Sequence, residues 1–64
     1  MPLVQVYVWT GRDPEFKKDI ISGITKVFVE KGIPAQAVEV LVHEVPKDSW
    51  GMGGVTAAER GTGK

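Results

Sequence analysis

The stretch Met1-Pro2-Leu3-Val4-Gln5-Val6-Tyr7-Val8-Trp9 decides the fold of this 64-residue chain. Its β-branched and aromatic residues, with valine at every second position, predict a strand. Proline is tolerated as the first residue of a strand, because no ladder donor is needed there. Pro2 also has a chemical interpretation, since removal of Met1 would leave a free secondary amine, which is a base.

A helix and a second strand follow. Asp13 and Pro14 are typical of a helix start, and the apolar periodicity predicts a helix from about Pro14 to Lys31. The expected buried stripe consists of Phe16, Ile20, Ile21, Ile24, Val27 and Phe28. Gly23 indicates either close backbone packing or a chance occurrence. The alternating run from Val38 to Val45 predicts the second strand.

These elements form a β-α-β unit, whose strands are parallel and whose crossover is right-handed. One helix covers only one face of such a pair, and we assign it to the valine-lined face. The residues expected on the uncovered face are Leu3, Gln5, Tyr7, Trp9, Leu41 and Val45. Parallel sheets are seldom open on one side, so we expect another subunit there.

The length and composition of the chain also favour an oligomer. We expect residues 1–64 to form one domain, and so short a chain buries too little surface to be comfortably stable alone. It has no cysteine, and its eight basic and eight acidic residues give a net charge of zero. The sequence therefore favours small molecules or copies of itself over nucleic acid or a membrane as partners. Without an apparent signal peptide or membrane segment, we expect a cytoplasmic protein.

The glycine-rich tail has two interpretations. Ser49 to Gly54 predicts a tight hairpin, whose glycines supply positive φ angles. A flexible linker is the alternative, although Trp50 argues against it. The segment lacks the lysine and the strand-to-helix context of a phosphate-binding loop.

Taken together, these features resemble the small 4-oxalocrotonate tautomerases over nearly the whole chain. The resemblance rests on Pro2 before an alternating strand, Gly11-Arg12 at its end, the helix at Asp13, Pro34, and the turn Trp50-Gly51-Met52-Gly53-Gly54. It implies an α+β fold of the tautomerase superfamily, with two parallel strands, one crossover helix and a short C-terminal hairpin. It also implies a homo-hexamer assembled as a trimer of dimers.

The implied reaction moves a proton within a small enol or unsaturated keto acid, such as 2-hydroxymuconate or phenylenolpyruvate, and needs no cofactor. Pro2 is the expected catalytic base and acid, because one amine titrating near the working pH can take a proton and return it. An α-amino group titrates at about 7.7–8.0 and a prolyl amine higher, so the site must lower this pKa by desolvation or a nearby cation.

The resemblance also implies substrate-binding residues. Arg12 is the expected carboxylate anchor, reaching the site from a neighbouring subunit, and its planar guanidinium suits that role. Trp50 occupies the position of the family's active-site phenylalanine and is expected to form a pocket wall or an interface anchor. Glu39 stands where well-known members have a second arginine, so it is a candidate substrate-binding residue that would repel a dianionic diacid. His43 has no partner ligand at suitable spacing, so no metal site is predicted.

Two alternatives remain open at this stage. The first is a cofactor-independent hydratase or dehalogenase of unsaturated acids, in which Pro2 stays protonated and Glu39 activates water. The second is a non-catalytic oligomeric module, in which Pro2 only begins a strand. If Met1 stays attached, the nitrogen of Pro2 is an amide and cannot act as a base.

Overall fold

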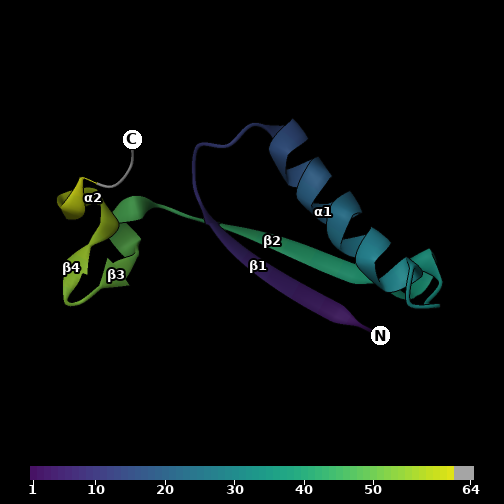
Figure 1. The fold of residues 1–64 in the computed structure, drawn as a ribbon. Coiled ribbons are helices and arrows are strands. Elements are labelled where there is room, and N and C mark those ends of the chain that lie inside the picture. Colours follow the sequence, from purple (N-terminus) through teal and green to yellow (C-terminus); the bar gives the residue numbers. More distant parts are fainter. Residues whose placement is uncertain (62–64) are drawn as a thin grey trace.

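The computed structural model of the protein describes residues 1–61. Its elements are β1 (Leu3–Trp9), α1 (Pro14–Val29), η1 (Ala35–Ala37), β2 (Glu39–Val45), η2 (Lys47–Ser49), β3 (Gly51–Met52), β4 (Val55–Thr56) and α2 (Ala57–Arg60). The molecule is elongated, with dimensions of 43 × 23 × 13 Å. Figure 1 shows a β-α-β unit from which the β3–β4 hairpin and α2 extend at the end away from the N-terminus.

The sheet consists of β1 and β2, which pair in parallel as predicted. Leu3 lies beside Glu39, and Trp9 lies beside Val45. The pairing continues beyond both ends, because the Glu39 N–H donates to the Pro2 carbonyl at 2.9 Å and the Thr10 N–H donates to the Val45 carbonyl at 3.1 Å. The crossover helix α1 joins the two strands and lies over one face of the pair (Figure 1). The expected β-α-β architecture with a C-terminal hairpin is confirmed.

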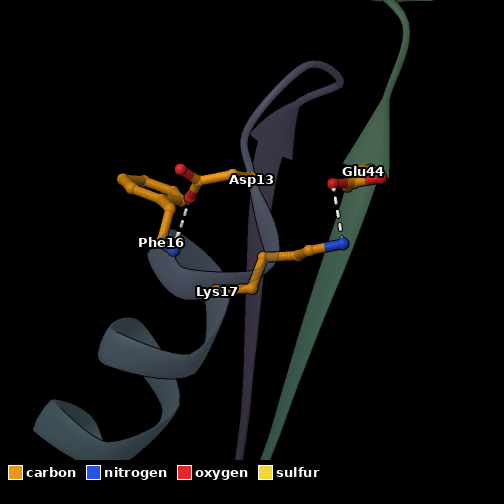
Figure 2. A network of polar contacts seen from close by, with 4 residues as sticks. All are labelled: Asp13, Phe16, Lys17 and Glu44. Atoms are coloured by element: carbon orange, nitrogen blue, oxygen red, sulfur yellow. Dashed lines mark hydrogen bonds and ion pairs between the residues drawn. The ribbon is translucent and has the colours of Figure 1, made fainter.

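The start of α1 follows the predicted capping chemistry. Asp13 is the N-cap residue, and its side chain accepts a hydrogen bond from the Phe16 N–H at 2.9 Å (Figure 2). Pro14 follows in the first turn, where its missing N–H costs nothing. One turn further, the Lys17 ammonium lies 3.0 Å from the Glu44 carboxylate of β2, which links the helix to the strand (Figure 2).

The end of α1 differs slightly from the prediction. The helix ends at Val29 rather than Lys31, because the chain turns at Gly32, whose φ is +95°. Apart from the neighbouring backbone of its own helix, Gly23 has no described atom within 4 Å of the position that a Cβ would occupy, so the structure shows no close packing of another element against this glycine. Two members of the expected buried stripe, Ile21 and Val27, are 40% and 52% exposed, because one two-stranded sheet is too narrow to cover them.

The sheet face opposite α1 is uncovered in the single chain. Leu3 and Leu41 are each 46% exposed and Tyr7 is 55% exposed, as predicted. Trp9 is only partly exposed, because it packs edge-to-face on Trp50 at a centroid distance of 5.8 Å. Among the residues that the structure describes, Ala57 is the only buried hydrophobic residue. The single chain thus has almost no core of its own.

The tail forms the predicted hairpin rather than a flexible linker. Gly51 pairs with Thr56 and Met52 pairs with Val55 in antiparallel register. The two residues between the strands, Gly53 and Gly54, have φ angles of +62° and +88°. Positive φ at both central positions is the requirement of a type I′ hairpin turn, which glycine meets without strain. Within residues 1–61, neither helix has the length and apolar content that crossing a membrane requires.

Candidate active site

Pro2 lies at the N-terminal end of β1, at the edge of the molecule. Its ring is partly exposed, and the preceding Met1 is 91% exposed. The Pro2 carbonyl accepts the hydrogen bond from the Glu39 N–H, so the backbone at this position is fixed by β2. If Met1 is removed, a secondary amine is left at a fixed and accessible place.

Glu39 is the first residue of β2 and therefore the neighbour of Pro2 and Leu3. It is exposed, and its side chain starts on the uncovered face, which it shares with Leu3 and Leu41. We call the group of Pro2, Leu3 and Glu39 the proline end of the sheet. It brings the predicted base and the predicted carboxylate together within one chain.

Arg12 lies at the other end, on the loop between β1 and α1. Its guanidinium carbon is 4.4 Å from the centre of the Phe16 ring, which orients the planar group. The residue is exposed and borders an open groove of about 460 Å³, which is also lined by Asp13, Glu15 and Asp19. Because these carboxylates border the groove, the groove itself is unfavourable for an anion.

Trp50 lies at the base of the hairpin, between η2 and β3. The Ala57 N–H donates to the Trp50 carbonyl at 2.7 Å, and the indole packs edge-to-face on Trp9. The Lys47 ammonium lies 5.3 Å from the Trp9 ring centre. The indole N–H of Trp9 is buried without a hydrogen-bond partner. We call the group of Trp9, Arg12 and Trp50 the tryptophan end.

The two ends are far apart in one chain. At about 3.3 Å per residue, the seven residues of β1 separate Pro2 from Trp9 by roughly 23 Å. Figure 1 shows the N-terminus and the hairpin at opposite extremes of the molecule. The single chain therefore places Pro2 beside Glu39, whereas Arg12, which packs on Phe16, and Trp50, which packs on Trp9, both lie toward the other end of β1.

His43 belongs to a cluster that the sequence did not indicate. Its ring stacks on Tyr7 at a centroid distance of 4.4 Å, and its Nε2 lies 3.0 Å from the Gln5 side-chain oxygen. The register of the parallel strands would have predicted this contact, because it places Tyr7 beside His43. Over the described part of the chain, no group of three or more His, Cys, Asp or Glu residues is placed to hold a metal ion.

Comparison with known proteins identifies the fold and the family. A family model described as "Tautomerase enzyme" matches residues 2–60. The 2-hydroxymuconate tautomerase of Comamonas testosteroni is 45% identical over 62 residues, covering 95% of this chain and 98% of that protein. A 2-hydroxymuconate tautomerase of Pseudomonas putida is 42% identical over the same number of residues and with the same coverage.

Solved structures agree with this assignment. A 4-oxalocrotonate tautomerase isozyme structure from Methylibium petroleiphilum superposes with a TM-score of 0.87 at 41% identity, covering 94% of this chain and 98% of that one. TomN, a 4-oxalocrotonate tautomerase homologue of the tomaymycin biosynthetic pathway, gives a TM-score of 0.88 at 37% identity, covering 92% of each chain. Family, length and fold therefore agree, and the chain belongs to the tautomerase family as a keto–enol tautomerase, an isomerase with the β-α-β fold.

Proposed function

We propose that Pro2, freed by removal of Met1, is the catalytic base and acid of this tautomerase. The observation that carries the proposal is the position of Pro2: it opens β1 at an exposed end of the sheet, in a chain 45% identical to a 2-hydroxymuconate tautomerase. The substrate is a small enol or unsaturated 2-keto acid, such as 2-hydroxymuconate or phenylenolpyruvate.

The reaction is a proton transfer that one amine can complete. The prolyl nitrogen takes the proton of the enol hydroxyl, and the electrons of that O–H bond form the carbonyl. The electron pair of the carbon–carbon double bond then takes the proton back from the prolyl ammonium and forms the new C–H bond. An amine that titrates near the working pH is suited to both steps.

Arg12 and Trp50 supply the binding groups in this proposal. The guanidinium of Arg12 holds the substrate carboxylate through paired N–H donors, and Trp50 forms an apolar wall. Since roughly 23 Å of β1 separates these residues from Pro2 in one chain, they must come from a neighbouring subunit. The nearly absent core and the uncovered face with Leu3, Tyr7 and Leu41 support a homo-oligomer, for which we propose a hexamer assembled as a trimer of dimers.

The proposal is tested with the Pro2→Ala variant and ketonisation assays on phenylenolpyruvate and 2-hydroxymuconate. Intact mass first establishes that Met1 is absent from the active protein. Pro2→Ala replaces the ring-held secondary amine by a freely rotating primary amine. We expect it to lose at least about 100-fold in kcat, because positioned general acid–base catalysis contributes at least that much. Pro14→Ala is the matched control, since it changes an exposed proline in the first turn of α1. Unchanged rates in Pro2→Ala, or full activity of a protein that retains Met1, would contradict the proposal.

One observation favours a second activity, hydration or dehalogenation of unsaturated acids. The Glu39 carboxylate next to Pro2 favours a protonated prolyl amine and offers a base for a water molecule. Addition of water to C3 of 3-chloroacrylate would give a 3-chloro-3-hydroxy acid. This product loses chloride and a proton as its hydroxyl becomes a carbonyl, so chloride is the readout. A rate that falls as the prolyl amine loses its proton is the expected profile, and absence of chloride release would exclude this activity.

A further inference from the structure

Glu39 is tied to the proposed base by the backbone. Its N–H donates to the Pro2 carbonyl at 2.9 Å, and its Cα is paired with that of Leu3. Neighbouring strands lie about 4.8 Å apart, so the Glu39 side chain begins within a few ångströms of the first residues of β1. The Glu39 side chain therefore starts on the uncovered face close to the backbone of Pro2.

The Glu39 carboxylate is also unneutralised. Across residues 1–61, its oxygens take part in no ion pair and no side-chain hydrogen bond, and the residue is exposed. Glu44, on the same strand, is different because the Lys17 ammonium lies 3.0 Å from its carboxylate. Among residues 1–61, no cationic side chain therefore offsets the Glu39 carboxylate at the proline end, whereas the cation proposed to bind substrate, Arg12, belongs to the tryptophan end.

We propose that Glu39 makes this enzyme selective for enols of 2-keto monocarboxylic acids over enols of dicarboxylic acids. The inference rests on the proposed function, since it assumes that the substrate lies between Pro2 of one chain and Arg12 of another. A monocarboxylate places its one charge on Arg12 and an uncharged aryl or alkyl group near Glu39. A dicarboxylate places its second charge close to Glu39.

The repulsion is strong enough to measure. Two like charges a few ångströms apart at a partly exposed site disfavour binding by roughly 10- to 100-fold. The relatives from Comamonas testosteroni and Pseudomonas putida carry the name of a dicarboxylate substrate, 2-hydroxymuconate. Because of Glu39, this chain would prefer a monocarboxylate, whereas the names of these relatives indicate a dicarboxylate substrate.

The test compares kcat/KM for phenylenolpyruvate and for 2-hydroxymuconate in the wild type, Glu39→Gln and Glu39→Arg. We expect the wild type to prefer phenylenolpyruvate, and the ratio to shift toward 2-hydroxymuconate by about 10- to 100-fold in Glu39→Gln. Glu39→Arg should shift it further. The matched control is Glu30→Gln, which removes an exposed carboxylate directly after α1, the helix that lies over the other face of the sheet.

Ionic strength gives a second readout that a purely structural role of Glu39 would not produce. Added salt screens exposed charges, so wild-type activity toward 2-hydroxymuconate should rise with salt, and this rise should disappear in Glu39→Gln. A substrate ratio in Glu39→Gln equal to that of the wild type would overturn the inference. If Pro2→Ala is inactive while this ratio is unchanged, only the Glu39 inference fails. If Pro2→Ala is fully active, the proposed function itself fails.

Discussion

The two ends of the β1–β2 sheet are built differently. At the proline end, Pro2 and Glu39 are joined only through the backbone, and the Glu39 side chain has no partner among the described residues. At the tryptophan end, aromatic contacts fix the side chains, since Trp9 packs on Trp50 and Arg12 lies over Phe16. The open end carries the proposed base, and the packed end carries the proposed binding groups.

This difference matches the demands of the chemistry. A base must be reached by the substrate, so an exposed strand end suits Pro2. Binding groups must be held in one orientation before the substrate arrives, because ordering them afterwards costs affinity. In a single elongated chain, 43 Å in its longest dimension, the accessible base and the ordered binding groups lie at separate places. A second chain that brings its tryptophan end to the first chain's proline end would complete the site.

The largest effect after loss of Pro2 is expected at Arg12. Arg12→Ala should lower kcat/KM by about 10- to 100-fold, mainly through KM, because charged hydrogen bonds contribute about 1.5–3 kcal/mol. Arg12→Lys should recover only part of this loss, since an ammonium lacks the planar fork. Steady-state kinetics with phenylenolpyruvate measures both variants. An Arg12→Ala enzyme with the wild-type KM would show that the tryptophan end does not bind the carboxylate.

A moderate effect is expected from the aromatic pair of the same end. Trp50→Ala should lower the free energy of unfolding by about 2 kcal/mol, because it removes a partly buried indole and its contact with Trp9. Trp50→Phe should lose less, since a smaller ring still packs there. Urea unfolding at fixed protein concentration provides the comparison. Equal stability of Trp50→Ala and the wild type would show that the aromatic packing does not fix this end.

The smallest effect concerns the ion pair between Lys17 and Glu44. Both side chains are about one-third exposed, at 34% and 30%, so solvent screens the pair and its contribution should stay below about 1 kcal/mol. A double-mutant cycle with Lys17→Met and Glu44→Gln measures the coupling. A coupling well above this value would mean that the pair is shielded from solvent, as it would be inside an assembly.

Local sequence signals predicted most of the fold. The period of two from Val4 to Val8 predicted β1, Asp13 and Pro14 predicted the start of α1, and the glycine pair predicted the hairpin turn. The pairing of Trp9 with Trp50 was not predicted, because it depends on where the hairpin lies relative to the sheet. The stacking of Tyr7 on His43 depends on the strand register, which local patterns do not specify.

The sequence supplied the candidate residues of the site, but it did not predict where these residues lie relative to one another in the fold. Pro2, Arg12, Glu39 and Trp50 were singled out from the sequence through the family resemblance. Their separation follows from the length of β1, because Arg12 comes three residues after Trp9 and Trp50 packs on Trp9, at the end of the strand away from Pro2.

Subunit mixing tests the central claim most directly. Activity is assayed at a substrate concentration well below KM, where Pro2→Ala and Arg12→Ala are each expected to lose about 10-fold or more of wild-type activity. The two proteins are unfolded together in equal amounts and refolded. If each site takes Pro2 from one chain and Arg12 from another, random assembly leaves about a quarter of the sites intact, and the mixture recovers about a quarter of wild-type activity. A mixture no more active than the two proteins refolded separately would contradict a site shared between chains.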